Sequence, residues 1–434
     1  MDILIKASQL ILSLSILVVL HELGHFIPAK LFKTRVEKFY LFFDPWFSLV
    51  KKKIGDTEYG IGWLPLGGYV KISGMIDESM DKEQMKKPAE DWEFRAKPAW
   101  QRLIIMLGGV TVNLLLGIFI YAMVLFTWGD RYLPNENVVD GVTCSDFALS
   151  QGFENGDQII SIDDDGVDRF LDITENMVLR DESFVVVVKR GGEEVDIPIG
   201  ENFIKHWKNN GKNLLFSPRT IVEIGEITSN SNAKKAGLKK GDILVSVNGV
   251  KTKYFDEFKK QLKDGRVDVG VLRSGEELVV PVEVVSGEIG FSLSNSSLDF
   301  TTKRFSFISS FPAGYNLAVK KLGGYIDQFA LIFNSDNDLG GELGGFGAIG
   351  SLFPSTWNWY SFWSLTAFLS LMLAFMNLLP IPALDGGHVM FLLYEIIAGK
   401  PAPEKIMERA QMIGMILLLS LLVFANGNDI YKLF

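Results

Sequence analysis

The sequence predicts a multi-pass α-helical membrane protein with four transmembrane helices and two inserted α+β domains. Four apolar stretches are each long enough to cross a bilayer, which takes about 20 helical residues. Between the second and third stretch lies a long polar segment, residues 129–361, that contains a sequence repeat. The 434 residues are 48% hydrophobic, as expected for a chain with both a membrane part and a part exposed to water.

The first predicted span, residues 1–28, ends in a motif of candidate metal ligands. Its apolar run is similar to a secretory signal, but no small-residue cleavage site follows, so we predict a retained helix. The run continues into an H-E-x-x-H motif, in which His21 and His25 share one helix face and can bind one metal ion. Glu22 can then act as a general base. A packed histidine pair is the alternative, but ionisable groups within a span are costly and usually functional.

A glycine-rich stretch distinguishes the loop that follows, residues 29–101. Gly60–Lys71 is aromatic and apolar but too short to span, so we predict a membrane-associated β-hairpin on the same side as the motif. Its exposed edge could pair with an unwound substrate. An ordinary cytoplasmic β-loop is the alternative. The candidate substrate-binding residues are Gly67, Gly68, Tyr69 and Val70.

Charge predicts the orientation of the spans. Basic residues follow the first span, precede the second span at 102–128, and lie between the third and fourth, whereas the other flanks are acidic. The positive-inside rule then places the loops 30–102 and 386–405 in the cytoplasm. Both termini and the segment 129–361 lie outside, and the active site lies near the cytoplasmic side.

The external segment contains two similar copies. Gly152–Asp163 matches Gly237–Asn248, and each copy is predicted to continue as strand, helix and hairpin. The pattern A-G-L-x-x-G-D-x-I-x-x-V-N-G at Ala236–Gly249 resembles a PDZ domain. We predict PDZ-like domains at 129–215 and 216–300, which either bind an extended peptide on a sheet edge or only restrict access.

Composition excludes two further classes of site. The net charge of −9 predicts no broad nucleic-acid-binding surface. Cys144 is the only cysteine, so neither an intramolecular disulfide nor a cysteine-rich zinc site can form. Neither Cys144 nor His206 suggests a role.

The end of the third span supplies a candidate third ligand. An amphipathic juxtamembrane segment, 301–361, leads into this span at 362–387, and the fourth follows at 405–426. Catalytic zinc normally has three protein ligands plus water. Asp385 is the one ionisable residue of the third span, and Pro380 and Pro382 predict a broken helix that can aim its carboxylate into a cavity. A solvent-exposed helix cap is the alternative.

The H-E-x-x-H motif and the later N-x-x-P-x-P-x-L-D-G motif together resemble the signature of the site-2 proteases, which are intramembrane zinc metalloproteases. The resemblance covers nearly the whole chain. It implies one Zn²⁺ per chain, held by His21, His25 and Asp385, with Glu22 as catalytic base. Asn377 and the hairpin would hold substrate. Asn113 stands where the family often carries a Gly-Pro…Asn motif, although Val110 replaces the proline here.

The resemblance also implies a function. It predicts an endopeptidase of the bacterial inner membrane that cuts within the transmembrane segment of single-span proteins. Such substrates include an anti-sigma factor first cut outside by a site-1 protease, and remnant signal peptides. Two alternatives stay open: an inactive PDZ scaffold with a structural zinc, and a zinc enzyme that acts on lipid or on mating-type peptides.

Overall fold

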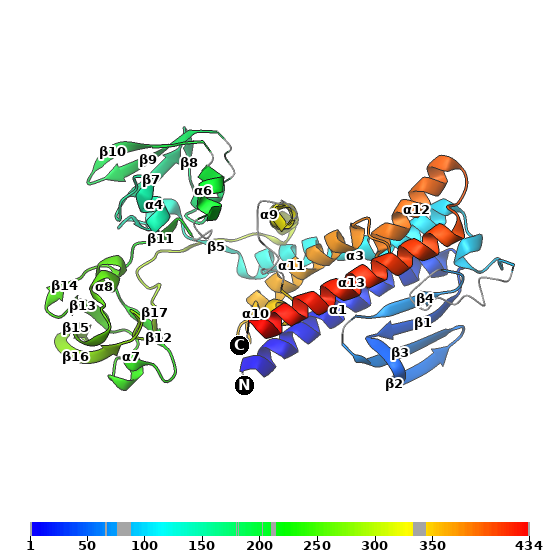
Figure 1. Ribbon diagram of the computed structural model, residues 1–434, viewed down its shortest axis with the longest axis horizontal. Helices are drawn as coiled ribbons and strands as arrows, with labels where there is room; N and C mark the ends of the chain where they lie inside the picture. Colours follow the sequence, from blue (N-terminus) through cyan, green and yellow to red (C-terminus); the bar gives the residue numbers. More distant parts are fainter. Residues whose placement is uncertain are drawn as a thin grey trace. The chain divides into compact units, whose positions relative to one another are not determined.

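The computed structural model describes residues 2–65, 67–75, 88–178, 180, 182–201, 203–209, 214–332 and 344–432. They form two compact units, one from the residues up to Gly129 with those from Arg304 onward, and one from Asp130–Lys303. Leu66 of the predicted hairpin and parts of the predicted segments 29–101 and 301–361 lie outside the described residues. Figure 1 labels the elements of both units.

Four helices of the first unit, within the part of the chain that the structure describes, are long and apolar enough to cross a membrane. They are α1 (Asp2–Leu31), α3 (Ala99–Trp128), α11 (Trp359–Leu378) and α13 (Glu404–Tyr431). Helix α3 is central, because it packs against both α1 and α11. The bounds of α1, α3 and α13 differ by a few residues from the predicted 1–28, 102–128 and 405–426.

The third span is shorter than predicted. Helix α11 ends at Leu378 rather than at residue 387, because Leu379 precedes Pro380 and adopts an extended conformation, with ψ 144°. A turn through Pro382 follows. A further helix, α12 (Asp385–Ala398), then begins where the sequence predicted a loop from residue 386. Asp385 therefore lies on the first turn of α12 and not at the end of the third span.

The predicted hairpin is instead part of a four-stranded sheet of order β2-β3-β1-β4. The strands are β1 (Val36–Leu41), β2 (Phe43–Ile54), β3 (Thr57–Leu64) and β4 (Tyr69–Ile72). Strand β1 lies between β3 and β4, parallel to β3 and antiparallel to β4. The prediction that β3 and β4 form a hairpin is therefore wrong, although β4 is an edge strand as expected.

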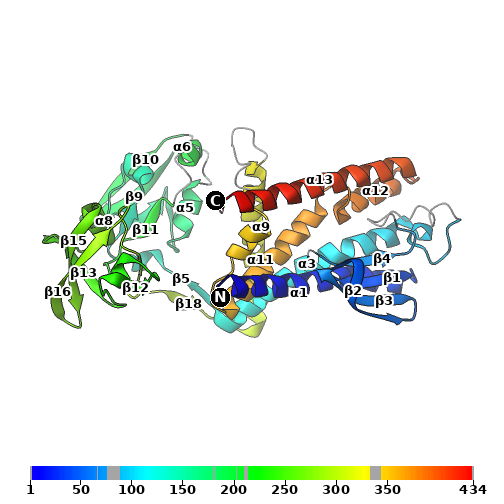
Figure 2. The ribbon, with the colours of Figure 1, turned by 60° about the horizontal axis from the view of Figure 1, so that its bottom comes forward.

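Helix α9 (Phe307–Ile332) crosses the long helices of its unit. It is seen end-on in Figure 1, where α3 and α11 run from side to side, and it stands upright in Figure 2. Gly314 allows α9 to approach α3, since a Cβ there would lie 2.6 Å from the backbone nitrogen of Ala122. Its outer side exposes large apolar side chains, among them Ile308 and Tyr315. Helix α9 is thus an amphipathic helix lying across the candidate spans.

The second unit contains the same fold twice. The first half has a four-stranded sheet of order β10-β9-β7-β8, and the second half repeats it as β16-β15-β13-β14. The first set is β7 (Gln158–Ile162), β8 (Asp165–Gly166), β9 (Phe184–Arg190) and β10 (Glu193–Ile199). The second is β13 (Ile243–Val247), β14 (Val250–Lys251), β15 (Gly265–Arg273) and β16 (Glu276–Val284). Each sheet has its own apolar core.

Short helices and strands complete the two halves. In the first half these are β6 (Val142–Cys144), α4 (Asp146–Ser150), α5 (Asp172–Val178), α6 (Phe203–Asn209) and β11 (Phe216–Pro218). In the second they are β12 (Ile224–Ile227), α7 (Asn232–Lys235), α8 (Phe255–Gln261) and β17 (Phe291–Leu293). Strands β5 (Asp130–Tyr132) and β18 (Thr301–Lys303) pair where the chain enters and leaves the unit.

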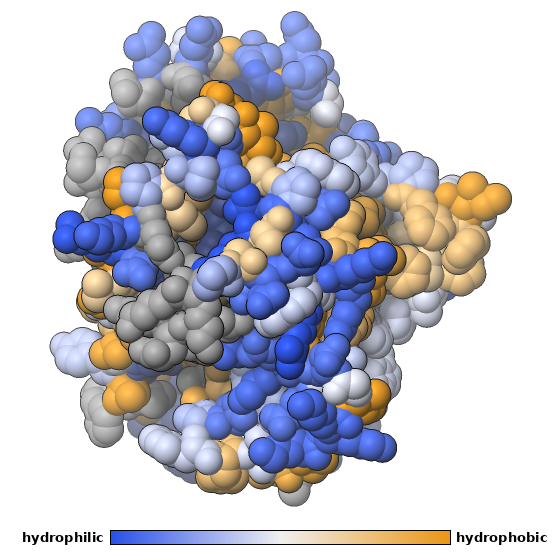
Figure 3. Space-filling model, turned by 90° about the vertical axis from the view of Figure 1, so that its right-hand side faces the viewer, coloured by the Kyte–Doolittle hydropathy of each residue, from blue (hydrophilic) through white to orange (hydrophobic). Residues whose placement is uncertain are grey.

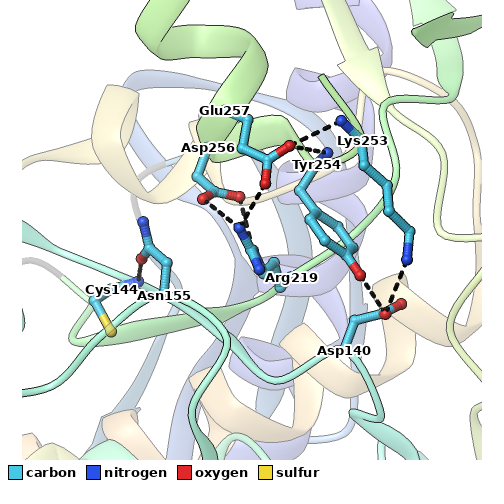
Figure 4. A network of polar contacts seen from close by, with 8 residues as sticks. All are labelled: Asp140, Cys144, Asn155, Arg219, Lys253, Tyr254, Asp256 and Glu257. Carbon is cyan, nitrogen blue, oxygen red and sulfur yellow. Dashed lines mark hydrogen bonds and ion pairs between the residues drawn. The ribbon is translucent and has the colours of Figure 1, made fainter. Parts of the chain in front are cut away.

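The boundary between the halves lies later than the predicted residue 215. Strand β11 pairs with β6, so the first half extends to Pro218. Arg219 follows directly and bonds twice to Asp256 of the second half at 3.0 Å, while Tyr254 donates to Asp140 of the first half at 2.6 Å (Figure 4). Cys144 lies nearby in the core of the first half, where burial raises the pKa of its thiol to about 12.

The sequence repeat also repeats an ion pair whose carboxylate is buried. Asp242 receives two bonds from Arg273, at 2.7 and 2.6 Å, and Asp157 receives two from Arg190, at 2.7 Å each. Each aspartate also accepts the backbone N–H three residues earlier at 2.8 Å. The G-D step common to both copies therefore places a buried carboxylate that ties a turn to the end of β9 in the first half and of β15 in the second.

We expect Asp242→Asn to lower the free energy of unfolding of the second half by about 2 kcal/mol, because it removes charge-assisted bonds to a buried carboxylate. Burial alone would raise the pKa of Asp242, but the bonds from Arg273 and from the backbone of Lys239 lower it below 3.8. The pair therefore stabilises the fold above pH 3.8, and this contribution is lost as the pH falls through the folded-state pKa. Denaturant unfolding at pH 7 and at low pH measures it.

The matched control is Glu226→Gln, which breaks the ion pair of Glu226 with Lys240, whose side chains are 77% and 71% exposed. Such surface pairs contribute little, so its unfolding should match that of the unmodified protein. Equal stability of the Asp242 and Glu226 variants at pH 7 would contradict the role given to the buried pair.

Candidate metal centre

Three predicted ligands converge in the first unit. Helix α1 carries His21 and His25 one turn apart, and the first turn of α12 carries Asp385. The two Nε2 atoms lie 3.2 Å apart, and each lies 3.3 Å from Asp385 Oδ2. These residues form a candidate metal-binding group among the residues that the structure describes.

Neighbouring groups orient the two histidines. His25 is nearly buried, and its Nδ1 lies 2.8 Å from the carbonyl oxygen of Ile105 on α3, so Nδ1 carries the proton and Nε2 presents a lone pair. Asn113 of α3 is fully buried, and its side-chain nitrogen lies 3.1 Å from His21 Nδ1, while its Oδ1 has no hydrogen-bond partner among the described residues. Because the oxygen and nitrogen of an amide can be exchanged, we assign the turned amide, in which Oδ1 accepts a hydrogen bond from the Nδ1–H of His21. Both rings then direct Nε2 toward Asp385.

Zinc fits this triangle. A tetrahedral Zn²⁺ with bonds of about 2.0–2.1 Å needs ligand atoms about 3.3 Å apart, which agrees with the three observed separations. Asp385 Oδ2 is buried and accepts no hydrogen bond from the described residues. Lone pairs directed at one another are repulsive unless a cation lies between them. The donor set of two imidazoles and one carboxylate is typical of catalytic zinc.

The histidines and Asp385 line a cavity of about 630 Å³, together with Glu22. The cavity is also lined by Gly68 and by residues of β4, including Tyr69 and Val70. Because β4 pairs only with β1, its other edge is free of strand partners within the described residues. Burial and the Asp44 carboxylate, which accepts the phenol proton at 2.8 Å, raise the pKa of Tyr69, so its hydroxyl stays protonated.

The other predicted site residues of the first unit have different surroundings. Asn377 at the end of α11 brings its side-chain nitrogen 3.4 Å from His21 Nε2. Pro380 and Pro382 belong to the turn between α11 and α12, and Gly67 lies against the ring of Phe43. His206 belongs to α6 of the second unit and is not among the residues that line this cavity.

Sequence reasoning missed several residues that line the cavity: Lys38, Phe43, Asp44, Met106 and Gln411. For most of them no local signal existed, because they come from strands and helices whose packing is not visible in the sequence. Gln411 is different, since an amide next to the apolar run of a candidate span is itself a signal. His388, which the sequence allowed either as a group that supports the ligands or as a loop residue, lies on α12 and lines the cavity.

Comparison with known proteins agrees with this geometry. Residues 9–421 match the model of peptidase family M50. The chain belongs to this family, the site-2 proteases. It is similar to the regulator of sigma E protease of Haemophilus influenzae, at 29% identity over the whole of both chains. A Vibrio cholerae protein whose name includes zinc metalloprotease is 27% identical, also over the whole of both. Metalloprotease MmpA of Caulobacter vibrioides is 26% identical over 99% of this chain and 96% of its own.

The chain is therefore a zinc metalloprotease with four candidate spans. This confirms the predicted enzyme class and the predicted cofactor. It also argues against the inactive scaffold and against a lipid-cleaving enzyme, because the matched family and the relatives are named as peptidases or metalloproteases.

Proposed function

We propose that this protease hydrolyses a peptide bond within the transmembrane segment of single-span membrane proteins. The observation that supports the proposal is the triangle of His21, His25 and Asp385. Both histidines lie on α1, which is long and apolar enough to span a bilayer, and the edge strand β4 lines the same cavity as the triangle. A soluble substrate would not need two of the ligands placed on a helix that is long and apolar enough to span a bilayer.

The edge strand supplies a way to hold such a substrate. A transmembrane helix satisfies its backbone bonds internally, so a stretch of it must unwind before its peptide bond can be attacked. The unwound stretch needs new backbone partners, and the free edge of β4 offers them by strand addition. Gly68, Tyr69 and Val70 would then contact the substrate, with Tyr69 fixed by Asp44.

Each residue in and around the triangle has a separate role in the proposed hydrolysis. His21, His25 and Asp385 hold zinc, which when bound polarises the scissile carbonyl and activates water. Glu22 removes the proton of the attacking water and passes it to the leaving amine. The Asn377 amide donates to the carbonyl oxygen as it gains negative charge. Asn113 keeps the ring of His21 in one orientation.

We further propose that the protein lies in the bacterial inner membrane, with the site near the cytoplasmic side and both termini outside. The basic loops support this orientation. Figure 3 looks onto the α12 and β1–β4 end of Figure 1 and shows many hydrophilic residues, as expected where a protein borders water, together with a hydrophobic projection and smaller hydrophobic groups. The paired folds of the second unit would be external PDZ-like domains.

By analogy with the relative named regulator of sigma E protease, an anti-sigma factor already shortened by a site-1 protease is the proposed substrate, with remnant signal peptides as a further class. The PDZ-like halves would admit substrates by size or bind their free ends. The second unit has its own repeated sheets, and the β5–β18 pair brings its two ends together. These features support the proposal that the unit can be replaced by a linker without disturbing the rest of the chain.

Purified protein in lipid vesicles tests this proposal. We expect it to cut a single-span substrate with a short outer tail but not the same span with a folded outer domain. Chelation should abolish cutting, and added zinc should restore it. Replacing residues 130–303 with a short Gly/Ser linker should admit the long substrate. Failure to cut either substrate, with zinc bound, would contradict the proposed substrate class. Continued refusal of the long substrate by the linker variant would contradict only the size filter.

A further inference from the structure

The fourth candidate span carries a buried glutamine, Gln411. Helix α13 is the least buried of the four, and Met412 and Ile413 are 45% and 66% exposed. Gln411 beside them is only 7% exposed. A polar side chain that faces inward from such a helix needs a hydrogen-bond partner there.

That partner is the turn which precedes Asp385. Gln411 Oε1 accepts the backbone N–H of Ala383 at 3.2 Å. Gly414, three residues later on the same face of α13, lies directly against Pro382, since a Cβ there would lie 3.1 Å from Pro382 Cα and overlap its carbonyl oxygen. Helix α13 thus holds this turn by a hydrogen bond and by backbone contact.

The turn needs external support. Ala383 has φ +82°, in the left-handed region that residues other than glycine rarely adopt. Such a conformation persists when surrounding contacts determine it. Only Leu384 separates Ala383 from Asp385, so a change at Ala383 is passed directly to the start of α12. Gln411 also lines the same cavity as Asp385.

We propose that Gln411 is a positioning residue for Asp385: its bond to Ala383 holds the strained turn, so that the carboxylate stays in line with His21 and His25. The fourth span is therefore part of the metal centre although it carries no ligand. This inference rests on the proposed role of Asp385 as a zinc ligand.

Zinc affinity tests the inference without using activity. In the purified full chain, we expect Gln411→Met, which keeps the length but removes the acceptor, to bind zinc about 10-fold more weakly in competition with a chelator. Gln411→Glu keeps an acceptor oxygen and should retain most of the affinity. The visible absorption of bound Co²⁺ should change in the Met variant, because the ligand geometry changes. Met412→Leu, on the exposed side of α13, is the matched control.

The outcomes separate the two proposals. Unchanged zinc affinity and Co²⁺ spectrum in Gln411→Met would overturn the role of Gln411 while leaving the metal centre intact. Absence of zinc from the unmodified protein would overturn both. If Gln411→Met does not fold, Gly414→Ala decides in the same assay, because its methyl group displaces Pro382 while Gln411 is kept. Weaker zinc binding supports the inference, and unchanged binding overturns it.

Discussion

Glu22→Gln is expected to lower the rate of peptide cleavage by about 10³-fold or more, while zinc stays bound. Glutamine has the shape of glutamate but cannot accept the proton of the attacking water. Glu22 lines the cavity but is not one of the three ligating residues, so the metal centre should not change. The measurement is the rate of product formation from a short-tailed single-span substrate, with the zinc content determined for the same preparation.

Two comparisons make this result specific. Glu90→Gln changes an exposed glutamate of the same unit and should leave both rate and zinc content unchanged. Asp385→Asn should lose zinc together with activity, since it weakens a ligand. Loss of zinc in Glu22→Gln would show that Glu22 acts as a ligand, and undiminished cleavage would show that the proton goes elsewhere.

The parts of the site that could be predicted are those whose geometry is local. His21, Glu22 and His25 share one helix, so their spacing determines their relative positions. Asp385 could be proposed because two prolines and two glycines mark a break near it. The structural repeat was likewise visible, because the G-D step that binds an arginine recurs in both halves.

The parts that could not be predicted depend on packing between distant segments. Helix α12 was expected to be part of a loop, 386–405, between the predicted third and fourth spans. Gly386 and Gly387 are instead where the preceding turn packs onto the helix, since a Cβ on Gly387 would lie 2.6 Å from Pro382 Cα. The order of the β1–β4 sheet and the contact of Gln411 with Ala383 also join segments that no local pattern relates.

The close approach of α3 to α1 supports the second large prediction. A Cβ on Gly109 would lie 2.6 Å from His21 Cε1 and 2.8 Å from His21 Nδ1, and it would overlap Nε2 of His25. Alanine is the better helix former by about 1 kcal/mol, so Gly109→Ala does not weaken α3 itself. Its methyl group must instead displace the imidazoles. We therefore expect this variant to fold but to bind zinc about 100-fold more weakly, and to lose cleavage in parallel.

Variants at two other glycines test whether the loss of zinc affinity in Gly109→Ala comes from displacement of the histidines. Gly427→Ala in α13 makes the same change where nothing lies within 4 Å, so zinc binding and cleavage should be retained. Gly108→Ala would meet the backbone of Gly24 rather than a side chain, so it should separate α1 from α3 and lower the folding stability as well. Normal zinc affinity in Gly109→Ala would mean that the histidines can move without loss of the metal. The close crossing at Gly109 would then serve only helix packing, and the rigidity of the ligand triangle would have to come from Ile105 and Asn113 alone.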